Sequence, residues 1–171
     1  MVLIGIMTAA LCIVAPFSIP LPVSPVPVTL ANFMLFLSLY ILGTRKAFVS
    51  YVIYLLLGLI GLPVFSGFAG GAAKLFGPTG GYLAGFLFMI PVTGLLFDKL
   101  AKSVILRILS MILGAAICDL FGTAWLCLQL QLDFAGGLGV GVIPYLPGDL
   151  IKIILAALVG PVLAKAVNRV A

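Results

Sequence analysis

The sequence predicts an all-α membrane protein: a single domain over residues 1–171, built as a bundle of six transmembrane helices with both termini cytoplasmic. Composition is the first reason, because 64% of the residues are apolar, 8% are charged, and Glu and His do not occur. A water-soluble domain carries about a quarter charged residues, whereas a chain in lipid must hide charge and satisfy its backbone internally. Long unbroken apolar runs, rather than short alternating ones, favour helices over a β-barrel.

The distribution of basic residues is the second reason, and it predicts the orientation. Most of them lie in alternate connections or near the C-terminus: Arg45 and Lys46, Lys99 and Lys102, and Lys165 and Arg169. The opposite connections hold only Lys74. Because Lys and Arg bias short loops toward the cytoplasm, the even-numbered connections and both termini are predicted to be cytoplasmic. The basic residues form no clustered stripe, so nucleic acid is not expected as a partner.

The predicted spans, in chain order, are the apolar stretches 2–16, 30–43, 47–65, 82–97, 103–132 and 149–167. A crossing needs about 20 apolar residues, so the first two are short and require tilt or local thinning of the bilayer. The fifth is long, and a kink near Gly114 or Gly122 or an extra turn beyond the lipid would accommodate it. Residues 1–14 are apolar enough for a signal peptide but lack a basic n-region and a cleavage site, so we expect a retained first helix.

The connection between the first two spans, residues 18–29, is rich in proline. Its four prolines are Pro20, Pro22, Pro25 and Pro27. Proline fixes φ and pushes the preceding residue toward an extended conformation, which excludes a helix here. A rigid, apolar, extended segment could lie across the mouth of a cavity as a lid, or it could be a stiff linker between two helices. The spacing does not decide between these two interpretations.

Glycine dominates the next outer connection, residues 66–82. Glycine permits positive φ and a close approach of backbone to a ligand. Phe68, Phe76 and Tyr82 are interleaved with the glycines, and aromatic faces beside open backbone suit a flat organic solute better than a plain flexible turn does. No phosphate-binding P-loop pattern occurs in the chain, so ATP hydrolysis is not expected here.

The strongest candidate site follows the glycine-rich segment 133–145, where the last span begins. Pro147 and Gly148 break the preceding structure, so Asp149 either caps the new helix or binds a ligand. Lys152 lies three residues later and emerges on the same helical face. A lysine held at the bilayer centre costs about 2.5 to 3.5 kcal/mol, whereas an exposed i,i+3 ion pair returns about 0.2 to 0.5 kcal/mol. A ligand-binding role for this pair is therefore favoured over a purely structural one.

Two further residues of the fifth span are ambiguous. Asp119 is an acid inside an apolar span and is a functional candidate for that reason. It could instead pair with Lys152 or Arg107, or remain neutral, and we leave it outside the predicted site. Trp125, toward the outer end of the span, is either a residue of the interfacial aromatic belt or a ring that stacks on a ligand.

The remaining side chains argue against an enzyme and against a metal site. The three cysteines lie inside apolar spans without partners at metal-ligand spacing, so they are expected to be small buried side chains: Cys12, Cys118 and Cys127. With no His, no Glu, and no Ser or Cys nucleophile beside a base, an intramembrane enzyme is not expected.

Four motifs taken together resemble a known family. They are Pro25-Val26-Pro27-Val28-Thr29-Leu30; Gly61-Leu62-Pro63-Val64-Phe65 followed by Gly77-Pro78-Thr79-Gly80-Gly81-Tyr82-Leu83; Phe121-Gly122-Thr123 with Trp125-Leu126; and Leu146-Pro147-Gly148-Asp149-Leu150-Ile151-Lys152. Each is weak alone, but their order over nearly the whole chain is similar to that of BioY, the biotin-specific S components of energy-coupling factor (ECF) transporters.

This resemblance implies a multi-pass protein of the bacterial plasma membrane that captures biotin from outside with high affinity and needs no cofactor. The implied partners are a transmembrane coupling (T) protein and two cytoplasmic ATPase subunits that supply the energy. Members of the family are thought to topple in the membrane when they dock. An S component for another vitamin, or a stand-alone biotin facilitator, are the alternatives.

The resemblance also implies roles for residues. Asp149 would accept the ureido N–H groups of biotin, and Lys152 would donate to its ureido carbonyl or its carboxylate. The outer loops would close over the site, with further contacts from Gly77, Thr79, Gly80, Phe68, Tyr82 and Trp125. Docking on the coupling protein would use small residues of the first span, whose spacing equally suits packing against this chain's own helices: Gly5, Ala9 and Ala10.

Overall fold

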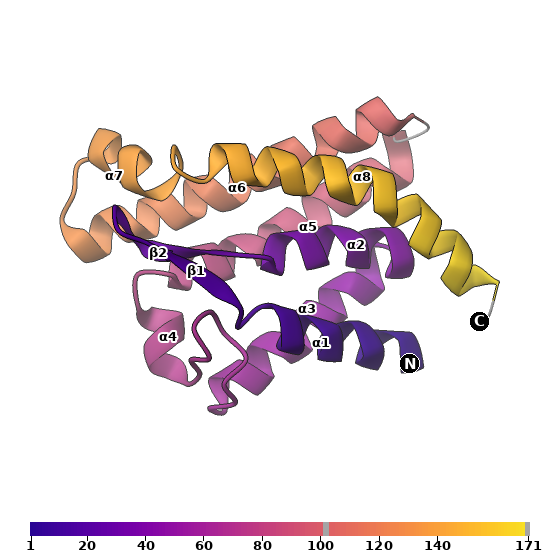
Figure 1. The fold of residues 1–171 in the computed structure, drawn as a ribbon, viewed down its shortest axis with the longest axis horizontal. Helices are drawn as coiled ribbons and strands as arrows, with labels where there is room; N and C mark the ends of the chain where they lie inside the picture. Colours follow the sequence, from indigo (N-terminus) through magenta and orange to yellow (C-terminus); the bar gives the residue numbers. More distant parts are fainter. Residues whose placement is uncertain (101–102, 170–171) are drawn as a thin grey trace.

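The computed structural model describes residues 1–100 and 103–169, so Lys102, a basic residue of one predicted cytoplasmic connection, lies outside the described residues. The described chain is mainly helical (Figure 1), and each predicted span contains a helix. These helices are α1 (Val2–Val14), α2 (Ala31–Leu42), α3 (Thr44–Leu59), α5 (Gly80–Leu100), α6 (Val104–Leu130) and α8 (Leu146–Asn168).

Within the described residues, four helical segments are long and apolar enough to cross a membrane: Ala31–Leu59, Gly80–Lys99, Val104–Leu130 and Leu146–Val167. Gly43, with a φ of 72°, interrupts the first of these, so α2 and α3 are separate helices. The helix α1 is apolar but shorter. The helix α6 is 27 residues long and continues through both Gly114 and Gly122.

The proline-rich connection forms an antiparallel hairpin of β1 (Ser18–Leu21) and β2 (Ser24–Thr29). The extended conformation predicted from the prolines is confirmed, but an all-α description omits this two-stranded sheet. The register is irregular at Pro20, which supplies no N–H to the ladder.

Two short helices lie in the glycine-rich outer connections: α4 (Ala72–Phe76) and α7 (Phe134–Gly141). Glycine content alone does not predict α7. Asp133 is its N-cap, because its carboxylate accepts a hydrogen bond from the backbone N–H of Gly136 at 3.2 Å. The packing of α7 against α6 and β2 then compensates for its weak helical propensity.

The last helix, α8, begins at Leu146, earlier than the predicted residue 149, and this corrects the interpretation of Asp149 as an N-cap. Tyr145 is the residue before the helix, and Pro147 lies in the first turn, where its missing N–H costs no helical hydrogen bond. Asp149 also lies within the first turn, where an acid interacts favourably with the helix dipole. Among the described residues, its carboxylate accepts hydrogen bonds from the side chains of Asn32 and Lys152 and from no backbone N–H.

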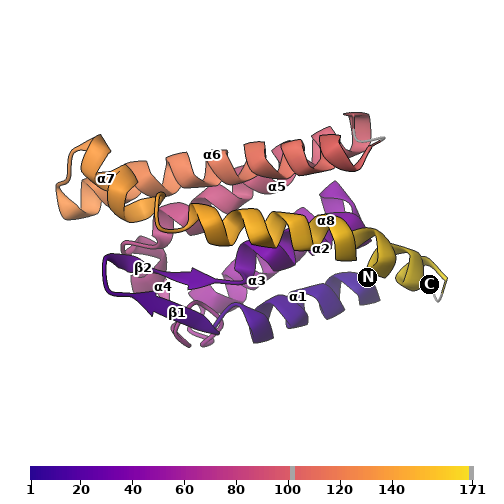
Figure 2. The ribbon, with the colours of Figure 1, turned by 45° about the horizontal axis from the view of Figure 1, so that its top comes forward.

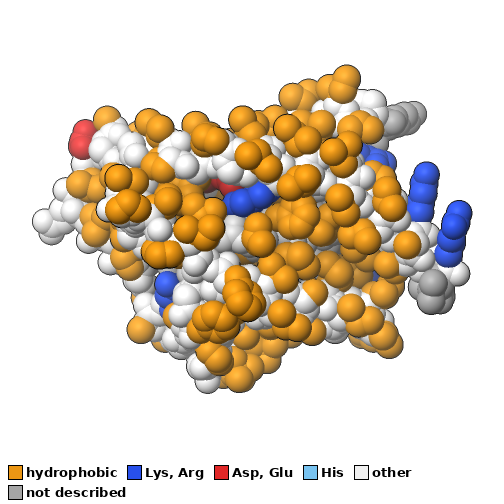
Figure 3. All heavy atoms as spheres, in the orientation of Figure 1, with side chains coloured by type: hydrophobic (Ala, Val, Ile, Leu, Met, Phe, Trp, Pro, Cys, Tyr) orange, Lys and Arg blue, Asp and Glu red, His pale blue; other side chains and the backbone are white. Residues whose placement is uncertain are grey.

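The long helices run roughly along one axis, so the molecule has two distinct ends (Figures 1 and 2). One end holds the hairpin, α4 and α7, and the other holds the N-terminus, the α2–α3 connection, the end of α5, the start of α6 and the end of α8. Basic side chains cluster at the second end, where two of them protrude in Figure 3. The described basic residues at the start of α3, near the end of α5 and near the end of α8 are Arg45, Lys46, Lys99, Lys165 and Arg169.

Glycines let α5 and α6 pack closely. A Cβ added at Gly81 would lie 2.2 Å from the Cβ of Trp125, and one added at Gly85 would lie 2.9 Å from the carbonyl oxygen of Cys118. Small residues at such positions allow the close backbone contact that associates helices in lipid. The α5–α6 pair therefore forms one continuous wall of the fold.

Two buried tyrosines of α3 tie this helix to its neighbours. Tyr51 donates to the carbonyl of Leu83 at 2.8 Å, and Tyr54 donates to the carbonyl of Val64 at 3.0 Å. Their rings stack with centroids 5.7 Å apart. Because each hydroxyl has a partner, both rings can be buried without leaving an unpaired polar group.

Candidate functional site

A cavity lies between the hairpin and the neighbouring ends of the long helices, and its residues come from nearly every element of the fold. In Figure 3, red and blue side chains lie in a hollow of an otherwise orange surface, below α8. Much of the lining is apolar or aromatic, including Val26, Phe65, Leu83, Phe86 and Met89. The polar and ionisable side chains in the lining are Thr29, Asn32, Tyr54, Ser66, Thr79, Tyr82, Asp119, Tyr145, Asp149 and Lys152.

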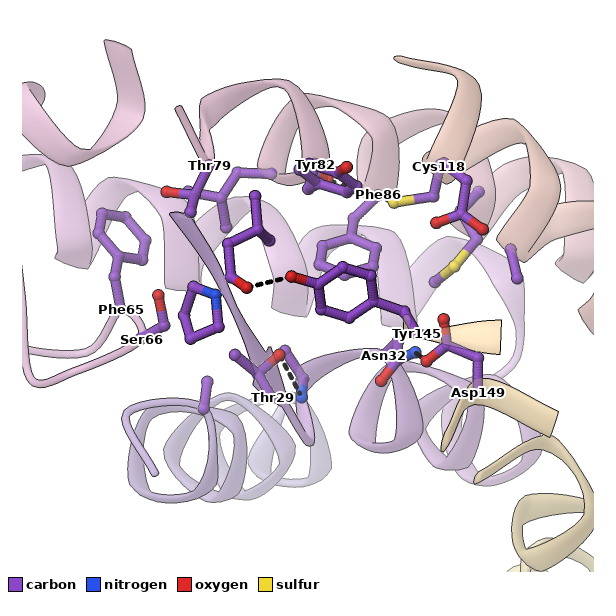
Figure 4. Close-up of a pocket in the computed structure, with 18 of the residues that line it drawn as sticks. Thr29, Asn32, Phe65, Ser66, Thr79, Tyr82, Phe86, Cys118, Tyr145 and Asp149 are labelled. Carbon is purple, nitrogen blue, oxygen red and sulfur yellow. Dashed lines mark hydrogen bonds between the residues drawn. The ribbon is translucent and has the colours of Figure 1, made fainter. Parts of the chain in front are cut away.

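The predicted acid and amine of α8 meet on the cavity wall. The Nζ of Lys152 lies 3.0 Å from the Oδ1 of Asp149, and the side chains are 10% and 14% exposed. The same Oδ1 accepts a hydrogen bond at 2.8 Å from the side-chain amide of Asn32, which lies on α2 (Figure 4). The two side chains therefore lie on the same helical face, as their spacing predicts.

This cluster keeps unused hydrogen-bonding capacity. Among the described residues, no hydrogen bond reaches Oδ2 of Asp149, and Lys152 makes one of the three hydrogen bonds that an ammonium can donate. A ligand could therefore find both an acceptor and a donor here without breaking a contact already present.

Tyr145 connects the start of α8 to the hairpin. Its hydroxyl donates to the backbone carbonyl of Val26 in β2, and its ring lies across the middle of the cavity (Figure 4). Burial raises the pKa of Tyr145 above its usual value, and the charge of Asp149 acts in the same direction, so the hydroxyl keeps the proton that it donates. β2 itself lines the cavity through Val26, Pro27 and Thr29, which favours a lid over a mere linker.

The opposite end of the cavity is formed by Phe65, Ser66 and Thr79 (Figure 4). Thr79 is 8% exposed, and its hydroxyl has no hydrogen-bond partner among the described residues. An unpaired buried polar group costs about 1–3 kcal/mol. Tyr82 lines the cavity and donates its hydroxyl hydrogen to the carbonyl of Gly141 at 2.8 Å.

Three of the predicted site residues lie behind the lining instead of in it. The indole Nε1 of Trp125 donates to the carbonyl of Gly77 at 2.9 Å, so this ring braces the loop. A Cβ added at Gly80 would lie 1.8 Å from the carbonyl oxygen of Leu75, so only glycine fits there. The three residues Gly77, Gly80 and Trp125 therefore determine the path of the chain on either side of Thr79.

Phe68 also lies outside the cavity lining. It is 58% exposed, has a φ of 56°, and packs edge to face against Phe17 with ring centroids 5.3 Å apart. The structure thus brings together Asp149, Lys152, Thr79 and Tyr82, and places Phe68 on the surface beside the hairpin.

Six polar or ionisable residues of the cavity lining were not included in the predicted site: Thr29, Asn32, Tyr54, Ser66, Asp119 and Tyr145. Asn32 is one of only two asparagines in the chain and stands in an apolar helix, which is a signal that could have been used. The sequence holds no comparable indication for Tyr145, because the residue that it contacts, Val26, is 119 positions away in the sequence. Asp119 was considered, but its position on a cavity wall depends on how α6 packs.

The small residues of α1 are only partly covered. Gly5 and Ala9 are exposed, Ala10 is half-buried, and a Cβ added at Gly5 would meet nothing within 4 Å. Packing against the chain's own helices, the alternative considered for these residues, is therefore wrong for Gly5 and Ala9.

The arrangement suits an elongated organic ligand. One end of the cavity offers a carboxylate, an ammonium and an amide, the middle is apolar and aromatic, and the other end offers hydroxyl groups. Within residues 1–100 and 103–169 no cluster of three or more His, Cys, Asp or Glu side chains could hold a metal ion. The polar groups can orient a neutral or zwitterionic head by hydrogen bonds.

Comparison with known proteins gives a consistent result. The BioY family profile matches residues 1–169. The biotin transporter BioY of Thermotoga maritima is 42% identical over 161 residues, which cover 94% of this chain and 93% of that protein. The biotin transporter BioY2 of Lactococcus lactis subsp. cremoris is 35% identical over 167 residues, covering 98% and 91%.

A solved structure is similar as well. The crystal structure of the S-component for biotin from an ECF-type ABC transporter superimposes with a TM-score of 0.89 at 32% identity, over 96% of this chain and 89% of that one. The sequence profile, the curated relatives and the solved structure all cover nearly the full length of the chain, which therefore belongs to the BioY family.

Proposed function

We propose that this chain is the biotin-binding S component of an ECF-type importer in the bacterial cell membrane. The observation that carries the proposal is the buried pair of Asp149 and Lys152 on the wall of a cavity beneath the hairpin. The relatives that are named as biotin transporters support biotin as the ligand.

The head of biotin matches the cluster on α8. Its ureido ring has two N–H donors and one carbonyl acceptor. Oδ2 of Asp149 accepts an N–H group, and a free hydrogen of Lys152 is donated to the ureido carbonyl. Asn32 keeps the carboxylate in place through Oδ1 and leaves the other oxygen to the ligand.

The tail of biotin extends along the apolar middle of the cavity. Its carboxylate then reaches the end formed by Ser66 and Thr79, where the Thr79 hydroxyl gains the partner that it otherwise lacks. Trp125, Gly77 and Gly80 support this end from behind by fixing the loop, and Tyr82 contributes its ring to the wall.

The orientation in the membrane follows from charge. The end with the N-terminus and the end of α8 carries the basic residues and faces the cytoplasm, and the hairpin end faces outward. The chain crosses the membrane six times, with α1 and the pair α2 and α3 accommodated by tilt or thinning. A coupling protein and two ATPase subunits supply the energy, and α1 docks through Gly5 and Ala9, with Ala10 alongside.

Isothermal titration of the purified chain in detergent tests this proposal, with thiamin and riboflavin as controls. We expect one biotin bound per chain. Asp149→Asn and Lys152→Ala each weaken binding by at least about tenfold, or about 1.4 kcal/mol. Heat of binding with thiamin or riboflavin alone would contradict biotin as the ligand.

Two matched substitutions control for changes of charge. Asp98 accepts a hydrogen bond from Thr44 at 2.8 Å and does not line the cavity, and Lys165 lies in the last turn of α8. Asp98→Asn and Lys165→Ala should leave biotin affinity unchanged within about twofold. If Asp149→Asn and Lys152→Ala bind as the parent does, the assigned site is wrong.

A further inference from the structure

Asp119 is the acid that the proposed site does not use. It lies on α6, lines the cavity with Asp149 and Lys152, and is close enough for the charges of both to act on it. Lys152 already forms an ion pair with Asp149, and the guanidinium of Arg107 lies over the ring of Tyr40. No hydrogen bond from a described residue reaches the carboxylate of Asp119.

An unpartnered acid in this position carries a cost. A charged group removed from water is unfavourable unless it is paired or hydrogen-bonded, and a second carboxylate beside Asp149 adds repulsion. Nothing in the packing of α6 needs an acid there, because its neighbours on the cavity wall, Ala115 and Cys118, are small and weakly polar or apolar. A group in the cavity that hydrogen-bonds to this acid would offset the cost of burying it.

A second, independent observation indicates that the cavity is completed by a ligand. The Thr79 hydroxyl is more than nine-tenths buried, lines the same cavity, and has no partner among the described residues. The protein thus presents unpaired polar groups from two different elements into one space.

The position of Asp119 fits a role at the ligand head. Asp119 and Asp149 come from different helices but also share the lining of a shallow apolar groove with Leu150 and Ile153, so they are neighbours across the α6–α8 contact. Two acids on adjacent walls can approach one planar group from two sides.

The numbers of donors and acceptors also match. The cavity offers two carboxylates and one ammonium, whereas the ureido ring offers two N–H groups and one carbonyl. We propose that Asp119 is a second acceptor of the site, which takes one ureido N–H while Asp149 takes the other. This inference depends on the proposed function, since it assigns Asp119 a contact with the biotin head.

Specificity follows from this assignment. A site built to hydrogen-bond a particular N–H rejects an analogue that lacks it, because a buried acceptor is left unpaired. Biotin methylated on either ureido nitrogen should therefore bind at least about tenfold more weakly than biotin. Each of the two methylated isomers removes the partner of a different acid.

The experiment is a titration of three ligands against three proteins. The ligands are biotin and its two N-methyl isomers, and the proteins are the parent, Asp119→Ala and Asp98→Ala. Asp98 is a matched acid outside the cavity, near the end of α5. We expect Asp119→Ala to weaken biotin binding by at least about tenfold and to lose the discrimination against one isomer only. Asp98→Ala should keep the discrimination against both isomers.

Other results overturn the inference in distinguishable ways. If Asp119→Ala binds biotin as tightly as the parent does, or if its affinity for all three ligands falls by the same factor, Asp119 does not contact a ureido N–H. Asp119→Asn serves as a second variant in case Asp119→Ala fails to fold. It should also weaken biotin binding and reduce the discrimination against the same isomer. If the folded parent does not bind biotin at all, the proposed function itself fails together with this inference.

Discussion

Thr79 and Thr93 are both buried, but their hydroxyl groups are in opposite situations. The Thr79 hydroxyl has no partner among the described residues, whereas Thr93 donates to the carbonyl of Ser110 at 3.4 Å. Replacing Thr79 with valine removes an unpaired polar group and should stabilise the ligand-free protein by up to about 1 kcal/mol. The same change should weaken biotin binding several-fold, because the ligand carboxylate loses a donor.

Thr93→Val is the matched control. It should destabilise the protein by about 1 kcal/mol and leave biotin affinity unchanged, because Thr93 does not line the cavity. Thermal unfolding in detergent and titration with biotin measure both effects. A Thr79→Val protein that binds biotin as tightly as the parent would show that the hydroxyl is not used by the ligand.

At the residue scale, local spacing predicted part of the site. Asp149 and Lys152 are three residues apart on one helix, so their pairing follows from helical geometry alone. Asn32 reaches Asp149 across 117 residues, and the position of Asp119 on the cavity depends on the α6–α8 contact. No periodicity in the sequence encodes such contacts. The N-cap role considered as the alternative for Asp149 is wrong, because Pro147 is compatible with the first helical turn and α8 begins before Asp149.

Tyr145 ties the hairpin to the start of α8, because its hydroxyl donates a hydrogen bond to the carbonyl of Val26. Tyr145→Phe keeps the ring that crosses the cavity but removes this contact. We expect biotin to dissociate several-fold faster, because a lost hydrogen bond of about 1 kcal/mol makes opening of the hairpin easier. The dissociation rate, measured by chasing bound radiolabelled biotin with unlabelled biotin, tests this expectation.

Val23→Ala is a suitable control for the hairpin. Val23 is 63% exposed at the turn between the strands and does not line the cavity, so its removal should leave the dissociation rate unchanged. An unchanged rate in Tyr145→Phe would mean that opening of the hairpin does not limit release.

At the element scale, apolar run length predicted helices well and irregular segments poorly. The long helices occupy the predicted spans because a backbone in lipid must be satisfied internally. The prolines of residues 18–29 indicated an extended chain, but they did not indicate the turn at Pro22 and Val23 that pairs β1 with β2. In α7, four glycines argue against a helix, and its cap and its packing on α6 and β2 stabilise it.

At the scale of the whole molecule, the small residues of α1 are available to a partner helix. Gly5 and Ala9 are exposed on α1, and small residues on a membrane helix permit close approach of a second helix. If α1 docks on a coupling protein, the double substitution Gly5→Leu with Ala9→Leu should reduce ATP-dependent biotin uptake by at least about tenfold, with biotin affinity in detergent unchanged within about twofold. Ala84→Leu, at an exposed small residue of α5, is the matched control and should not reduce uptake.

The same assay separates an energised importer from a stand-alone facilitator. Cells or vesicles that contain the coupling protein and both ATPase subunits should accumulate biotin, and vesicles that contain this chain alone should bind biotin without accumulating it. No phosphate-binding P-loop pattern occurs in the sequence, so we expect ATP hydrolysis in the partner subunits. Equal uptake with and without the ATPase subunits would favour a facilitator, and uptake that is insensitive to the α1 substitutions would place the docking surface elsewhere on the molecule.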